Sequence, residues 1–146
     1  MISSIVKSSL MSMCIAVVAV YVLHYIQSNF IFQFLSSNII TIQIGLLAIN
    51  AATLGIILTK LKDIVDKGVP RAEFESVRVQ MLLSIREQVA LIIMAIIIIS
   101  LAEAKALPFH VPQMVFQVVL LACFVYALLI LYDTAKSVFV VLDDVS

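Results

Sequence analysis

Residues 112–132 read PQMVFQVVLLACFVYALLILY, a run without a charged side chain. At 1.5 Å per residue, a helix of about 20 residues crosses the ~30 Å hydrocarbon core of a bilayer. The run therefore predicts a transmembrane helix, because backbone polar groups in lipid must be hydrogen-bonded within the segment. Three further apolar runs of similar length predict three more spans, at residues 5–26, 39–61 and 83–102.

The composition of the whole chain agrees with a membrane protein. Of its 146 residues, 64% are hydrophobic and only 12% are charged. A water-soluble domain has about 45–50% apolar and about 25% charged residues. Lys plus Arg and Asp plus Glu balance at nine each, so no net field favours direct binding to nucleic acid. We expect an all-α integral membrane protein with one domain, residues 1–146, in contact with the lipid bilayer.

The basic residues predict how the chain is oriented. Six of them lie in or beside the connection 62–82, and Lys7 and Lys136 lie near the two termini. Only Lys105 falls on the opposite side. Because Lys and Arg accumulate in cytoplasmic connections, both termini are expected in the cytosol and the chain in the plasma (inner) membrane of the cell. The connection 62–82 is then a cytosolic hairpin, and residues 133–146 are a cytosolic tail.

The cytosolic hairpin has the pattern of two helices. Gly68-Val69-Pro70 interrupts charges at helical spacing, which predicts that the third helix begins near Pro70, before the membrane. An apolar stripe then follows at helical spacing, which gives a helix in water an apolar face: Phe74, Val77, Met81 and Ile85. The stripe either packs against neighbouring stems of the same protein or binds a different cytosolic protein.

Arg86 and Glu87 lie close to the start of the third span. A tight turn at Gly68 would place Arg86 level with Ala51, in the middle of the second span. Counting back from Glu103 instead places Arg86 about one turn inside the cytosolic boundary, where its side chain can reach the interface. We prefer the second estimate, since an unpaired arginine at the bilayer centre costs at least ~2.5–3.5 kcal/mol. Arg86 and Glu87 are therefore expected to be interfacial charges.

The second span has two distinct faces. On one face, small side chains recur at steps of three and four residues: Thr41, Gly45, Ala48, Ala52, Gly55 and Thr59. Small residues allow two helices in lipid to approach closely, so Gly45, Ala48, Ala52 and Gly55 are expected in a helix-packing contact. The opposite face carries two carboxamides in a coiled-coil-like seam: Gln43, Leu47, Asn50, Leu54 and Ile57.

The carboxamides of this seam need hydrogen-bond partners in hydrocarbon. The identical residue of a second copy is the simplest partner, which predicts a homo-oligomer formed through the second span. Around an axis of several copies, the same seam would line a narrow pore. Alternatively, Gln43 and Asn50 are satisfied by polar side chains within one four-helix bundle.

No pattern for catalysis or cofactor binding occurs in the chain. There is no nucleophile with His and carboxylate, no metal-ligand spacing and no glycine-rich phosphate loop. We therefore expect neither an enzyme nor a bound cofactor or metal. Cys14 and Cys123 lie in apolar runs and are interpreted as small hydrophobic residues.

Two classes of function fit these features. The first is a non-enzymatic, oligomeric membrane scaffold or sensor that presents its cytosolic helices to a protein partner. The alternative is a homo-oligomeric pore, holin-like or a defence effector, lined by the second span. With four spans, cytosolic termini and a charged second connection, the chain resembles the small four-helix membrane proteins of bacterial anti-phage defence, such as the membrane subunit of the Kiwa system. That resemblance implies a membrane detector that works with a separate cytosolic effector, and it transfers no functional residue.

Overall fold

The described part of the chain forms four long helices. They are α1 (Ile2–Tyr25), α2 (Phe30–Val65), α3 (Arg71–Glu103) and α4 (Gln113–Asp143). Each contains a stretch long and apolar enough to cross a membrane, namely Ile5–Tyr25, Phe30–Lys60, Met81–Glu103 and Gln113–Lys136. The prediction of an all-helical chain with four candidate membrane spans is confirmed.

The computed structural model describes residues 2–65, 71–103 and 112–143. Within these ranges the side chains are described except those of residues 2–4, 61–65, 71–77, 80 and 137–143.

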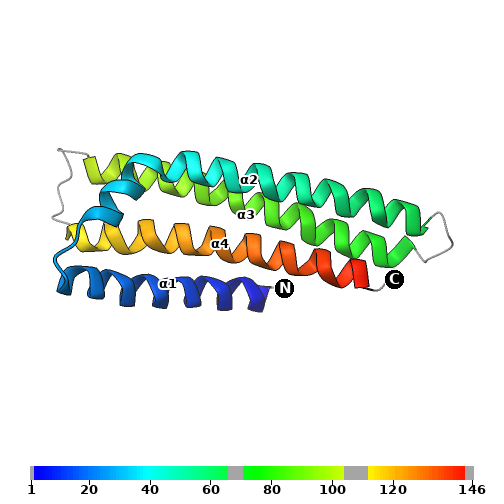
Figure 1. The fold of residues 1–146 in the computed structure, drawn as a ribbon, viewed down its shortest axis with the longest axis horizontal. Helices are drawn as coiled ribbons and strands as arrows, with labels where there is room; N and C mark the ends of the chain where they lie inside the picture. Colours follow the sequence, from blue (N-terminus) through cyan, green and yellow to red (C-terminus); the bar gives the residue numbers. More distant parts are fainter. Residues whose placement is uncertain (1, 66–70, 104–111, 144–146) are drawn as a thin grey trace.

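Helix α4 is at the centre of the arrangement. It packs against α1, α2 and α3, and α2 also packs against α3. Helix α1 packs along α4 alone among the described residues, so α2, α3 and α4 form a three-helix core with α1 attached at its edge (Figure 1). This leaves more of α1 facing outward than a closed four-helix bundle would.

Buried apolar side chains fill two clusters. The larger cluster joins all four helices and includes Val20, Leu35, Ile39, Ala95 and Ala127. The smaller one lies between α2 and α3 and is made by Leu54, Ile57 and Met81, with Leu58 and Ile85 packed against it. Within the candidate spans only 17–33% of residues are buried inside the chain, so most of the apolar surface is left for lipid.

Helix α2 begins nine residues earlier than the span predicted from residue 39. Helix α1 ends in a Schellman motif, in which Ser28 N donates to Leu23 O (3.0 Å) and Gln27 N donates to His24 O (3.1 Å). Gln27 has a φ of 54°, a left-handed conformation that glycine usually occupies at this position. A short turn therefore replaces the predicted connection, and Asn29 O accepts the first helical bond of α2, from Gln33 N (3.1 Å).

The hydrogen bonds of Asn50 fix the level of Arg86 relative to α2. Asn50 is hydrogen-bonded to Ser84 and Gln88, so Arg86 is level with residues 50 and 51, as a tight hairpin requires. Arg86 is exposed and lies five residues after Met81, the first residue of the candidate span of α3. Its interfacial position stays a prediction.

Three helices extend past α1 at the same end of the molecule (Figure 1). Helix α3 begins at Arg71, directly after Pro70, as predicted. We call residues 61–65 of α2, 71–80 of α3 and 137–143 of α4 the stem. Figure 1 shows α2, α3 and α4 running past the N-terminal end of α1 on this side. The 36 residues of α2 span about 54 Å, well beyond the ~30 Å hydrocarbon core.

Candidate functional site

A polar network lies inside the three-helix core, centred on Asn50. The Asn50 side chain is fully buried (0% exposed), and its Nδ2 donates to Ser84 Oγ (2.9 Å) and to Gln88 Oε1 (3.0 Å) of α3. Ser84 Oγ is also 3.4 Å from Thr134 Oγ1 of α4, which donates to Ile130 O (3.0 Å). We call Asn50, Ser84, Gln88 and Thr134 the polar network. It joins α2, α3 and α4 by side chains that hydrocarbon cannot solvate.

The polar network is incomplete in its hydrogen bonding. Asn50 Oδ1 and Gln88 Nε2 are buried without a partner among the described residues. Exchanging the N and O atoms of both amides keeps the contacts and again leaves one donor and one acceptor unpaired.

Gln43 lies two helical turns from Asn50 on the same face of α2. Its side chain is 2% exposed, and neither Nε2 nor Oε1 has a hydrogen-bond partner in the part of the chain that the structure describes. An unpaired buried amide destabilises a fold by about 1–3 kcal/mol. The buried amide of Gln43 therefore lowers the stability of this fold.

The predicted interfacial charges differ in their surroundings. Arg86 is exposed, whereas Glu87 is half-buried and its Oε2 accepts a hydrogen bond from Tyr126 Oη of α4 (3.2 Å). Asp133 of α4 is near enough to interact electrostatically with Glu87. The α3–α4 contact beside the polar network is thus lined by acidic and phenolic groups.

The structure assigns the two faces of α2 to opposite environments. The seam expected to face other copies or a pore is turned toward the interior of the chain: Gln43, Asn50, Leu54 and Ile57 are buried and Leu47 is half-buried. The face expected to pack against another helix is exposed throughout: Thr41, Gly45, Ala48, Ala52, Gly55 and Thr59. The seam is the face of α2 that packs within the chain, because Asn50 needs hydrogen-bond partners from the neighbouring helix.

The apolar stripe predicted as a cytosolic contact is partly internal. Met81 is buried and Ile85 half-buried, and both pack in the cluster with Leu54 and Ile57 of α2. These two residues support the base of the stem and do not present a free surface. The side chains of Phe74 and Val77 lie outside the described residues.

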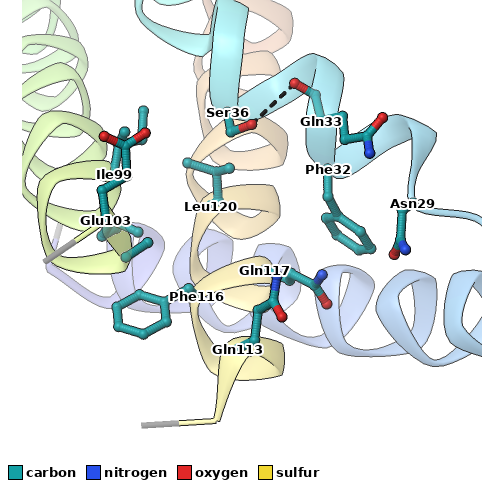
Figure 2. A pocket seen from close by; sticks show the side chains of 12 residues that line it. Asn29, Phe32, Gln33, Ser36, Ile99, Glu103, Gln113, Phe116, Gln117 and Leu120 are labelled. Atoms are coloured by element: carbon teal, nitrogen blue, oxygen red, sulfur yellow. Dashed lines mark hydrogen bonds between the residues drawn. The ribbon is translucent and has the colours of Figure 1, made fainter. Parts of the chain in front are cut away.

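A second polar feature lies at the other end of the helices. Two adjoining hollows of about 240 and 420 Å³ share Asn29, Phe32, Gln113 and Gln117. We call them together the amide cavity. Its carboxamides come from the α1–α2 turn and from α2 and α4: Gln27, Asn29, Gln33, Gln113 and Gln117. Figure 2 shows Gln113 and Gln117 extending from α4 toward Phe32 and Asn29.

The shape of α2 opens this cavity. In Figure 1 the first turns of α2 cross over from the α1 side before the helix runs alongside α3. Ser36 Oγ donates to Gln33 O (3.0 Å) and Asn38 Nδ2 donates to Phe34 O (2.9 Å), local bonds of a kind that accompanies helix bending. The structure brings His24, Gln113 and Gln117 to one hollow.

Sequence reasoning identified Asn50 and Gln43 but missed their surroundings. Ser84, Gln88 and Thr134 were not singled out, although Ser84 and Gln88 are four residues apart on one face of α3. That spacing is the signal that could have found them. Cys123 is buried, Cys14 is exposed, and both are free thiols.

Comparisons with known proteins add no family. No family model, no curated protein and no solved structure matches the chain. Among the described residues, no group of three or more His, Cys, Asp or Glu side chains is arranged to hold a metal ion.

We predict opposite stability effects for two similar substitutions in the seam. Gln43→Leu removes an amide that has no partner, so the free energy of unfolding should rise by about 1 kcal/mol. Asn50→Leu breaks two hydrogen bonds and leaves Gln88 without its donor. The free energy of unfolding should therefore fall by about 1–3 kcal/mol. Unfolding by SDS in mixed micelles measures both values. Equal losses in the two variants would show that Gln43 has a partner of its own.

Proposed function

We propose that the protein is a non-enzymatic membrane scaffold or sensor subunit that presents its stem to a partner protein in the cytosol. The observation that carries the proposal is the extension of α2, α3 and α4 past the N-terminal end of α1 at one end of the molecule (Figure 1). Three helices side by side make the stem a stiffer binding surface than a loop of the same length. The cluster of Leu54, Ile57 and Met81 fixes the stem to the membrane core.

The charges support a cytosolic stem. The connection between α2 and α3 and its flanks contain most of the basic residues of the chain, which the positive-inside rule assigns to the cytosol. Both termini are then cytosolic, and the amide cavity faces the other side of the membrane. Arg78 and Val79 are exposed on the membrane-proximal part of the stem and are available to a partner.

The small-residue face of α2 supports association between copies. The face is exposed along its whole length, and a Cβ built on Gly45 or Gly55 would meet no atom within 4 Å. Neighbouring exposed positions carry bulky isoleucines, Ile44, Ile49 and Ile56. A shallow strip between bulky side chains allows close approach of a second helix in lipid. We therefore propose a homo-oligomer through this face, in place of the carboxamide seam.

A pore lined by α2 has less support. It would need Gln43, Leu47 and Asn50 to face an axis shared by several copies, whereas Gln43 and Asn50 are buried within their own chain and Leu47 is half-buried. The scaffold proposal leaves these contacts intact. A place in bacterial anti-phage defence, with a separate cytosolic effector as the partner, belongs to the same proposal and rests on the overall layout of four spans and a charged stem.

The scaffold proposal predicts site-selective cross-linking in intact cells. A photoreactive benzoylphenylalanine at Val79, exposed on the stem, should form an adduct with a cytosolic protein, and Arg78→Glu should abolish that adduct. The same group at Val22, an exposed valine in the span of α1, is the matched control and should label only lipid or membrane protein. The proposal fails if Val79 gives no cytosolic adduct, or if expression of the chain dissipates the membrane potential.

The oligomer proposal predicts a loss of association without a loss of folding. Gly45→Ile with Gly55→Ile fills open space on a single chain, so helix content should be unchanged. Bulky side chains keep a second helix at a distance, so self-association should weaken by about tenfold or more. Energy transfer between labelled copies in liposomes measures self-association. Ala90→Ile on α3 is the control and should leave the energy transfer unchanged. A monomeric native chain, or equal transfer in the variant, would contradict the proposal.

A further inference from the structure

The amide cavity is equipped to recognise a ligand. Its five carboxamides, Gln27, Asn29, Gln33, Gln113 and Gln117, make no side-chain hydrogen bond to another group of the chain among the described residues. A carboxamide offers both a donor and an acceptor. Several uncommitted carboxamides around one hollow therefore provide a recognition surface that the fold itself does not use. The larger hollow, about 420 Å³, is of the size of small-molecule sites, about 300–1,000 Å³.

The electrostatics of the amide cavity favour an uncharged ligand. Among the described residues, neither hollow is lined by Lys or Arg, so this part of the lining offers an anion no fixed counter-charge. The ionisable side chains of the described lining are His24 and Glu103, and both are exposed. The N-termini of α2 and α4 and the C-termini of α1 and α3 meet at this end, so their partial charges offset one another.

The apolar lining narrows the ligand class further. Phe32 is buried and lies beside Gln117 in Figure 2, and Phe116 and Leu120 add apolar lining to the smaller hollow. A hydroxyl group both donates and accepts, as a carboxamide does, and the C–H face of a sugar or polyol packs against apolar side chains. Phe30, Glu103 and Gln113 are the end residues of their candidate spans, so the cavity lies where headgroups and water begin.

We propose that the amide cavity binds an uncharged, hydroxyl-rich ligand of the saccharide or polyol class. The ligand is either a free molecule from the aqueous phase or the hydroxylated headgroup of a membrane lipid. Gln113 and Gln117 hold its hydroxyl groups from α4, and Phe32 packs against its carbon face. The site lies at the opposite end of the helices from the stem, so this proposal does not depend on the partner of the stem.

The test uses the full chain in nanodiscs with one reporter. The chain contains no tryptophan, so Met114→Trp, at an exposed position that lines the larger hollow, introduces a single indole. In one arm, methyl-α-glucoside is titrated into phosphatidylcholine discs. In the other, phosphatidylglycerol discs are compared with phosphatidic acid discs, which carry a similar negative charge but lack the glycerol hydroxyls.

We expect a saturable change in indole fluorescence and a higher thermal stability in at least one arm, and the arm that responds identifies the source. Gln117→Leu should weaken the response at least about fivefold, because it removes a buried hydrogen bond to the ligand. Gln113→Leu, at an exposed position, provides the same test if Gln117→Leu does not assemble. Asn38→Leu, an exposed carboxamide that lines neither hollow, should leave the response unchanged.

Three results would overturn the proposal. The first is the absence of a saturable response in both arms. The second is a response that persists in the double variant Gln113→Leu with Gln117→Leu. The third is a response to tetramethylammonium or to inorganic phosphate with none to the glucoside or to phosphatidylglycerol, because the cavity would then select charge.

Discussion

A carboxamide buried between helices in lipid must find its hydrogen-bond partners in the protein, and Asn50 finds them on α3 of its own chain. This requirement fixes both the rotation of α2 and the register of the α2–α3 hairpin. The seam is turned inward, so the small-residue face is left on the outside. The same register places α3, from Arg71 onward, alongside α2, and both helices continue into the stem (Figure 1). One polar contact thus links the core to both surfaces proposed for association.

The two ends of the molecule differ because the four helices do not close into a bundle. Helix α1 packs only along α4 among the described residues, and the first turns of α2 cross over to reach α3. At that end the crossing leaves the amide cavity, lined by uncharged polar groups. At the other end, α2, α3 and α4 project together as the stem, which carries charged residues. Gln43 lies between them without a partner, and it is the least satisfied described group in the core.

The sequence predicted the parts of this fold that depend on local pattern. Apolar length predicted four spans, and Pro70 predicted the start of α3. Periodicity also placed Gln43 and Asn50 on one face of α2 and the small residues on the other. It could not tell which face is internal, because lipid accepts small and bulky apolar side chains equally. Ser84, Gln88 and Thr134 were missed because single hydroxyls and amides in apolar helices carry little signal before their partners are known.

The central claim is that Asn50 is held by Gln88 within a single chain. A double-mutant cycle with Asn50→Ala and Gln88→Ala tests it directly, through the free energy of unfolding measured at several protein-to-detergent ratios. The account predicts a coupling of about 0.5–1.5 kcal/mol that does not change on dilution. Additive losses, or a coupling that disappears as the chains are diluted apart, would contradict it, since Asn50 would then be unpaired or bound to another copy.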